Sequence, residues 1–290
     1  MKTRFLLSIF LIMLAVISTS LAYRPAYAYF DRLSSSAQET LTIGEWGIVN
    51  NLRKIIFGQE SLNDYQRTGN WTEDENGFQS NFGLLFIPND YTSYRVTLVA
   101  QLDYLGDEAT YGGFGLLFET SLDGNQDTGF ALQFDRGLLG VAIRPRINGG
   151  EQGTIALVRN ADNPVIPISR RDDFWVQEQK IILEVFQASE TKKLINVFLD
   201  EVLILENFII DSSLEESYLG LRAWGRPTEF RSLLVEELNS PIESFDPNRV
   251  YQKGEIVLFE DQLWLRDSDA SNTIPPGTNR PNRNFWKPLD

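Results

Sequence analysis

The feature that most constrains the fold of this chain is a succession of short segments in which apolar and polar residues alternate. In YRVTLVAQLDYL, residues 94–105, apolar side chains fall at nearly every second position with polar side chains between them. This alternation has the two-residue period of a β-strand with one buried face. The chain is therefore predicted to fold by pairing strands.

Further segments of this kind follow along the chain, separated by turn residues. They are residues 112–120, 129–135, 180–187, 194–206, 218–224 and 230–238. Asp200-Glu201 and Asn148-Gly149-Gly150 predict tight turns. Short strands with little helical pattern predict an all-β fold, a two-sheet antiparallel sandwich. Two interpretations of residues 48–67 remain open, a short helix and a first strand.

The order of these segments resembles that of the concanavalin A-like (laminin-G-like) jelly rolls. The resemblance rests on GNW near the start, the long strand from Tyr94, GGFGLLFET, GFALQFDRG and the closing LGLRAWGRPTEFRSLLVEEL, and it spans residues 69–238. It implies a jelly-roll sandwich. Because that fold is found in lectins, glycosidases and adhesion modules alike, the resemblance specifies the fold better than the function.

Composition excludes several kinds of chemistry. The chain has no histidine and no cysteine, which removes imidazole catalysis, thiol nucleophiles, disulfides and the usual zinc sites. Catalysis would have to use carboxylates, Tyr, Lys or Ser. A formal net charge of −14 disfavours nucleic acid as a ligand, because an acidic surface repels phosphates.

The first 28 residues have the pattern of an export signal. Lys2 and Arg4 precede the apolar run FLLSIFLIMLAVIS, and Ala26-Tyr27-Ala28 is a small-x-small cleavage site. The run is short for a membrane span, and neither a second apolar run nor a wall-sorting motif follows. We therefore expect a secreted or cell-surface protein without an integral membrane anchor.

The segment after the cleavage site resembles leaders of the SipW-type signal peptidase of Gram-positive bacteria. Residues 27–30, YAYF, and residues 40–44, TLTIG, carry the resemblance; an ordinary secretory leader is the alternative. Proteins with such leaders include biofilm-fibre components. The resemblance implies that residues 29–43 form a free strand that adds to a neighbour's sheet edge and so mediates self-association.

The domain organisation follows from these segments and from a break at Asn239-Ser240-Pro241. The sequence predicts a signal peptide (1–28), an N-terminal segment (29–43), the β-sandwich (44–239), a linker (240–249) and a small C-terminal β module (250–290). About forty residues without a disulfide is near the lower limit for a domain. Aromatic side chains are therefore expected to supply much of the module's core.

The C-terminal module resembles the chitin- and cellulose-binding modules of carbohydrate-binding families 5 and 12. The residues that carry the resemblance are Tyr251, Gly254, Val257, Phe259, Trp264, Pro276 and Trp286. It implies that Trp264 and Trp286, with Tyr251 behind them, stack on sugar rings. The alternative is that all three are core residues. The chain departs from the pattern at Trp264, usually Tyr, and at Glu260-Asp261, usually Asn-Gly.

Carboxylates give no clear catalytic pair. The E-x-D-x-(x)-E strand pattern of laminarinase-like enzymes is absent, and the adjacent acidic pairs point to opposite faces of a strand. Glu119 and Asp135 lie on predicted neighbouring strands, either approaching each other or lying at solvated strand ends. No catalytic residue is assigned.

One acidic turn has the spacing of a calcium loop. Asp123, Asn125 and Asp127 place oxygen ligands at alternate positions in DGNQDTG, as Ca²⁺ prefers. The same residue types are common in hairpin turns, so both interpretations stay open. Calcium is the only cofactor that the sequence suggests.

The leading hypothesis is a secreted carbohydrate-binding protein. It would engage chitin, cellulose or a cell-wall glycan through the C-terminal module and the jelly roll. Two alternatives remain: a glycoside hydrolase, since such modules often accompany one, and a structural surface or biofilm-matrix protein.

Overall fold

The fold is all-β in the part of the chain that the structure describes. This computed structural model describes residues 41–42, 48–49, 52–103, 111–170, 172–214, 217–239, 242–246, 249, 251–260, 262–267 and 285–289. The expected export signal, and the N-terminal segment apart from Leu41–Thr42, lie outside these residues. Within them the helical elements are three short 3₁₀ turns, η2 (Phe57–Gln59), η3 (Leu62–Asp64) and η4 (Asp173–Val176).

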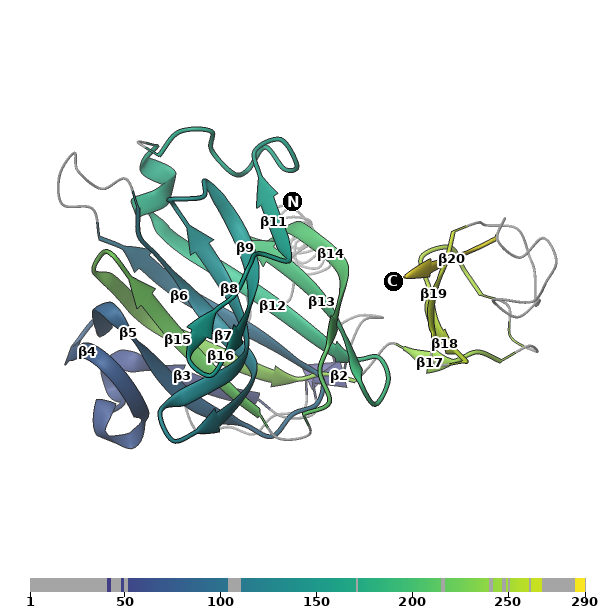
Figure 1. The fold of residues 1–290 in the computed structure, drawn as a ribbon, viewed down its shortest axis with the longest axis horizontal. Helices are drawn as coiled ribbons and strands as arrows, with labels where there is room; N and C mark the ends of the chain where they lie inside the picture. Colours follow the sequence, from purple (N-terminus) through teal and green to yellow (C-terminus); the bar gives the residue numbers. More distant parts are fainter. Residues whose placement is uncertain are drawn as a thin grey trace, which may run out of the picture. The chain divides into compact units, whose positions relative to one another are not determined.

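Two layers of antiparallel strands form a jelly-roll sandwich (Figure 1). The first layer contains β4 (Gln66–Asp74), β5 (Gly77–Asn89), β7 (Gly113–Asp123), β8 (Gln126–Asp135), β9 (Gly140–Ile147), β10 (Gly150–Glu151), β11 (Ala156–Arg159) and β15 (Ser217–Trp224). The second contains β3 (Leu52–Ile56), β6 (Tyr94–Leu102), β12 (Glu178–Gln187), β13 (Lys192–Leu199), β14 (Val202–Asp211) and β16 (Thr228–Glu237). The predicted sandwich is confirmed.

The two layers belong to one curled sheet. Its order is β10-β9-β8-β7-β15-β5-β16-β6-β12-β13-β14, with β11 on β9, β4 on β5 and β3 on β16. Strand β5 belongs to both layers, because residues 83–89 pair with β15 and residues 78–80 pair with β16. This sharing folds the first layer over the second.

The core lies between the layers and follows the alternation of the sequence. Val96 and Leu98 of β6 are fully buried, and Phe114 and Phe118 of β7 face them in the same cluster. The polar side chains between these positions therefore face outward from each layer.

Turn chemistry agrees with the sequence in two places. Asp200 and Glu201 both have positive φ, 47° and 71°, and join β13 to β14 in a tight turn as predicted. Asn148 and Gly149 do the same between β9 and β10, with φ of 50° and 78°. Residues 52–56, left open as helix or strand, form β3.

The described tail residues form a separate small sheet. Its strands are β17 (Glu243–Ser244), β18 (Ile256–Phe259), β19 (Gln262–Arg266) and β20 (Trp286–Leu289), in that order. Residues expected to be linker thus supply β17, which pairs in parallel with β18. The domain boundaries themselves stay a prediction.

A buried polar network stabilises a bulge in β7. The register with β8 shifts between Phe118 and Ser121, and Glu119 adopts φ +46° there. Tyr94 Oη and Ser212 Oγ donate hydrogen bonds to the Glu119 carboxylate at 2.9 and 2.7 Å, and Lys193 Nζ lies 3.5 Å away. Burial and the neighbouring carboxylate raise the pKa of Tyr94 well above its usual value.

We predict that Lys193→Met lowers the free energy of unfolding by about 3 kcal/mol, because removing one partner of a buried ion pair leaves the other uncompensated. Lys193 is 1% exposed. Lys192→Met, at the next position of β13, where the side chain is half-buried, is the control for the lost charge. Urea unfolding of both variants measures the difference, and equal free energies of unfolding would contradict the prediction.

Candidate functional site

The three predicted sugar-binding aromatics lie in the core of the tail sheet. Tyr251, Trp264 and Trp286 are 3%, 6% and 1% exposed, and cluster with Val257. The rings of Tyr251 and Trp286 meet edge to face, with centroids 5.3 Å apart. Their positions therefore fit the alternative interpretation, in which all three are core residues. Their role in carbohydrate binding stays a prediction, because a sugar stacks only on a ring face that it can reach.

The predicted calcium residues lie on a tight hairpin. Strands β7 and β8 continue to Asp123 and Gln126, so the loop between them is shorter than the sequence suggested. Asp127 pairs with Leu122 and shares its face of the hairpin, which places Asp123 on the opposite face. Asp123 and Asn125 are exposed and Asp127 is fully buried. The described residues contain no cluster suited to a metal, and calcium binding stays a prediction that this geometry does not favour.

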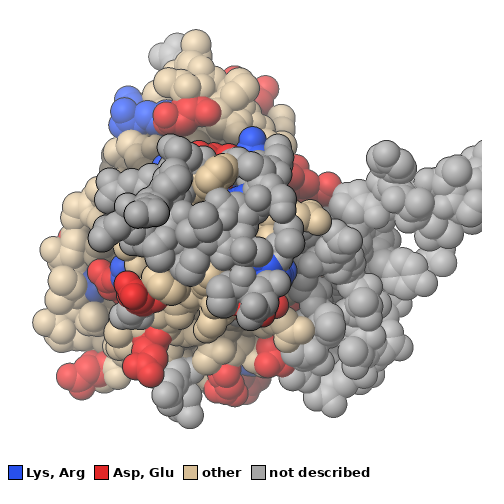
Figure 2. All heavy atoms as spheres, turned by 90° about the vertical axis from the view of Figure 1, so that its right-hand side faces the viewer, with Lys and Arg blue, Asp and Glu red and all other residues tan. Residues whose placement is uncertain are grey.

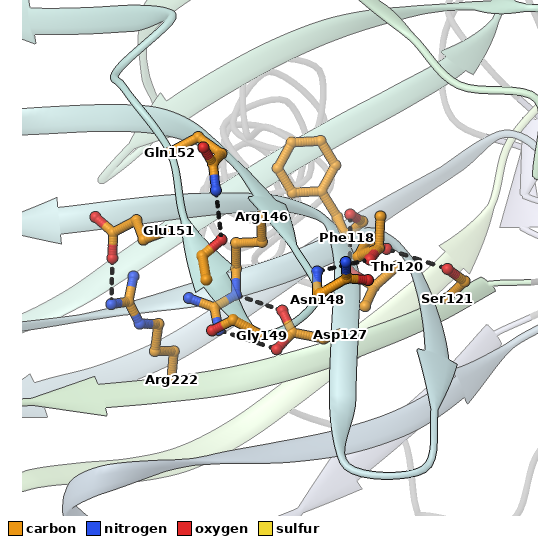
Figure 3. Close-up of polar contacts among 12 residues, drawn as sticks. Phe118, Thr120, Ser121, Asp127, Arg146, Asn148, Gly149, Glu151, Gln152 and Arg222 are labelled. Carbon is orange, nitrogen blue, oxygen red and sulfur yellow. Dashed lines mark hydrogen bonds and ion pairs between the residues drawn. The ribbon is translucent and has the colours of Figure 1, made fainter.

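Asp127 is instead the partner of Arg146 (Figure 3). Arg146 Nε and Nη2 donate to the two carboxylate oxygens, the second at 2.9 Å, and Nη2 also donates to the Gly149 carbonyl. The Gly149 amide in turn donates to the Asp127 carbonyl at 2.8 Å. The ion pair therefore fixes the β9–β10 turn against the start of β8.

Arg146 belongs to a group of polar side chains on the outer side of the first layer. We call this group the arginine face; its members are Asp127 and Gln133 of β8, Arg144 and Arg146 of β9, Glu151 of β10, and Arg222 and Trp224 of β15. Each lies on the outward-facing side of its strand. Side chains alternate between the two faces of a strand, and Leu132, Ile143 and Leu221, at the alternate positions, point into the core.

Glu151 connects both sides of this face. One carboxylate oxygen accepts from Arg144 on β9 and the other from Arg222 on β15, and Figure 3 shows Glu151 and Arg222 pointing toward each other. Strands β8 and β7 lie between these two partners in the sheet. The contact closes because the layer curls toward this side.

Gln133 lies on this face two strands from Arg222. Gln133 pairs with Gly115, and Gly115 pairs with Arg222, so the three positions form a line across the strands. A Cβ at Gly115 would lie 2.1 Å from the Leu132 carbonyl oxygen, so this position requires glycine. The sheet position between Gln133 and Arg222 therefore carries no side chain.

The face contains three buried N–H donor atoms without an acceptor in the described part of the chain. They are Gln133 Nε2, Arg144 Nε and Arg222 Nη1. The Gln133 side chain belongs to a residue that is 1% exposed. Most buried donors in proteins are paired, and leaving one unpaired costs about 1–3 kcal/mol, so three on one face require an explanation.

Trp224 supplies an aromatic surface beside these donors. Its ring lies against Gly113, where a Cβ would come within 2.6 Å of Trp224 Cζ2. The guanidinium carbon of Arg222 lies 4.7 Å from the ring centroid, a cation–π distance. Trp224 is half-buried, so part of its ring remains accessible.

The face is locally positive on an acidic chain. Three arginines stand against two carboxylates, Glu151 and Asp127, which leaves one positive charge. By contrast, acidic side chains are spread over the described surface in Figure 2. Burial lowers the pKa of Arg222, as do Arg144 and Arg146, while Glu151 opposes the shift. The arginines thus lie close enough to repel one another.

The sequence contains a signal for part of this face. Arg222 and Trp224 are spaced two apart within the predicted strand 218–224, which places them on one face. Arg144 and Arg146 have the same spacing on either side of Pro145. The contact of Glu151 with Arg222 has no sequence signal. The two residues lie on strands that are four pairings apart in the sheet, and the contact depends on how the sheet curves across these strands.

The carboxylates Glu119 and Asp135 do not approach each other. Gly113 pairs with Asp135, and Glu119 lies six positions farther along β7, about 20 Å away at strand spacing. They are not solvated strand ends either, since they are only 2% and 9% exposed.

The structure instead brings Glu184 and Glu236 to either side of Arg95. Arg95 Nε and Nη2 donate to Glu184 at 2.9 and 2.6 Å, and Nη1 lies 3.9 Å from Glu236. Both carboxylates face outward from the second layer, two strands apart, but are only 7% and 0% exposed. A substrate bond cannot be flanked by groups that solvent does not reach, so this arrangement is a structural ion-pair row.

We predict that this row makes stability pH-dependent. Burial raises the pKa of Glu236, opposed in part by Arg95, so the folded state holds the proton to a higher pH than the unfolded state. Stability is then full below the usual value of about 4.5 and falls as pH rises through the raised pKa. Glu236→Gln should be more stable than wild type by about 1 kcal/mol at pH 8 and equal to it near pH 4. Urea unfolding at both pH values tests this, with Glu237→Gln as control; a gap independent of pH would contradict it.

No family model and no curated protein matches the chain. Among solved structures, it is similar to the carbohydrate-binding module CBM66 from Bacillus subtilis, at 18% identity over 60% of this chain and 95% of that one, with a TM-score of 0.44. The VIP36 exoplasmic/lumenal domain in its Ca²⁺/Man2-bound form has 10% identity, coverages of 64% and 87%, and a TM-score of 0.45. The legume lectin-like domain from Entamoeba histolytica has 15% identity, coverages of 60% and 90%, and a TM-score of 0.38. At these values the similarities carry no conclusion about the ligand of this chain.

No helix in the described residues is long and apolar enough to cross a lipid bilayer.

Proposed function

We propose that this chain binds a glycan on the arginine face. The observation that carries the proposal is a partly exposed polar cluster beside the half-buried ring of Trp224, in which the side chains of Arg144 and Arg222 are 23% and 14% exposed. The same face contains the buried donors without acceptors, Gln133 Nε2, Arg144 Nε and Arg222 Nη1. A sugar ring has an apolar face of C–H groups that stacks on an indole, and oxygen atoms at its edge that accept hydrogen bonds. An aromatic surface with a few fixed polar groups is the usual composition of a small-ligand site.

The elements around the face give it a defined geometry. Arg146 is held by Asp127 and the β9–β10 turn, and Arg222 and Trp224 come from one regular strand. Sites built on strands position their side chains more accurately than sites on loops. The face therefore suits recognition of a ligand.

We also propose that the protein is secreted and that its tail engages a polysaccharide. Secretion is supported by the export pattern of residues 1–28, and engagement of chitin, cellulose or a cell-wall glycan by the tail pattern around Trp264 and Trp286. If the tail also binds, two linked sites on one polysaccharide would add avidity. The hydrolase and matrix-protein alternatives have no observation among the described residues that favours them.

A binding assay with the full secreted-form chain tests the proposal. We expect retention on at least one insoluble or soluble polysaccharide of a panel that includes chitin, cellulose, cell-wall glycan and plant acidic glycans. Trp224→Ala should weaken binding about tenfold or more, since a buried aromatic contact often contributes above 1 kcal/mol to binding. Phe82→Ala, which removes an aromatic side chain that is 68% exposed elsewhere on β5, is the control.

Thermal unfolding shows whether each variant is folded. Wild-type binding that Trp224→Ala leaves unchanged while folded would place the glycan site elsewhere, and the absence of wild-type binding to every glycan would reject the proposed function.

A further inference from the structure

We propose that the ligand of the arginine face carries a carboxylate, as a uronic acid unit of an acidic glycan does, and that Glu151 occupies the place of this carboxylate in the free protein. This inference rests on the proposed function and narrows it to a class of glycan.

The unpaired atoms on the face are all donors. Gln133 Nε2, Arg144 Nε and Arg222 Nη1 carry N–H groups, and no buried oxygen of the described part of this face lacks a partner. A sugar hydroxyl brings one donor and two acceptor positions, whereas a carboxylate brings acceptors alone. A site that offers only donors is therefore matched better by a carboxylate than by a hydroxyl group.

Glu151 shows which group this place holds. Its carboxylate gives one oxygen to Arg144 and the other to Arg222, from opposite sides of the face. Two guanidiniums that converge on one carboxylate are a common arrangement for carboxylate recognition. The face therefore already contains a carboxylate-binding position, filled by a side chain of the same protein.

Only the side chain of Glu151 has to move in this exchange. Its backbone stays in place, because Glu151 pairs with Arg146 and the next residue, Gln152, donates a backbone hydrogen bond to the Pro145 carbonyl at 2.9 Å. The Glu151 side chain is 23% exposed, so it can turn into solvent without breaking the strand pairing.

The exchange conserves charge. If a ligand carboxylate replaces that of Glu151 between Arg144 and Arg222, the number of charges on the buried face stays the same, and Glu151 becomes solvated. Arg146 does not take part, because both oxygens of the fully buried Asp127 hold it. Arg144 and Arg222 are thus available to a ligand carboxylate, and Arg146 fixes the adjacent turn.

Competition by Glu151 has a measurable consequence. For a ligand that must displace an internal group, the apparent affinity is the intrinsic affinity multiplied by the fraction of molecules in which the site is open. Glu151→Gln removes the competing negative charge while it keeps the shape of the side chain. The variant should therefore bind an acidic ligand more tightly than the wild type does.

The matched probes are a galacturonic acid oligosaccharide and the same oligosaccharide with its carboxyl groups methyl-esterified, measured by calorimetry on the full chain. We expect the wild type to bind the acid form at least tenfold more tightly than the ester. Glu151→Gln should strengthen binding of the acid form at least threefold and leave the ester unchanged. Glu229→Gln is the control, because Glu229 has the same 23% exposure and pairs with Arg231 outside this face.

The possible results separate the two proposals. Equal binding of acid and ester, or binding of neutral glycans alone, overturns the carboxylate inference and leaves glycan binding standing. Binding of no glycan in the panel overturns both. If folded Glu151→Gln binds the acid form no better than wild type, Glu151 is not a competitor but a support for the arginines. Thermal unfolding confirms that each variant is folded.

Discussion

The double pairing of β5 is the constraint on which the rest of the structure depends. One part of this strand pairs with β15 and another with β16, so the two layers are one continuous sheet. Within the first layer the sheet also curves toward its outer side, and this curvature brings Glu151 of β10 to Arg222 of β15 although β9, β8 and β7 lie between them. Without this curvature Glu151 would not reach Arg222, and the arginine face would be a row of separate side chains.

Buried charges have different roles at different places in this sandwich. Glu119 and Lys193 stabilise a bulge, Arg95 connects Glu184 with Glu236, and Asp127 holds Arg146 in the turn after β9. Glu119 and Asp127 are each matched by a cation, as burial requires, whereas Glu184 and Glu236 share Arg95 and burial raises the pKa of Glu236. The arginine face differs, because it combines one excess positive charge with donors that have no acceptor in the described residues. That difference makes it the candidate site.

Much of the fold could be predicted from the sequence, because alternation is a local signal. The period of two located β6, β12 and β15, and turn residues located the hairpin at Asp200-Glu201. The extent of β7 and β8 was less predictable, since polar residues continue the ladder to a two-residue turn at Gly124-Asn125.

The candidate site could be predicted only in part. Strand phase places Arg222 and Trp224 together, but their partner Glu151 comes from an approach across the sheet that no spacing encodes. The tail shows the converse. Aromatic residues at the right spacing suggested a sugar-binding surface, yet in a module this small the same rings are needed to fill the core, and Tyr251 and Trp286 lie there.

The most direct test of the central claim is hydrogen exchange of the full chain with and without a bound oligosaccharide, read by peptide mass spectrometry. We expect slower exchange in β15 and in the segment around Glu151, with little change in residues 251–266. Protection confined to residues 251–266 would contradict it and would place the glycan on the tail.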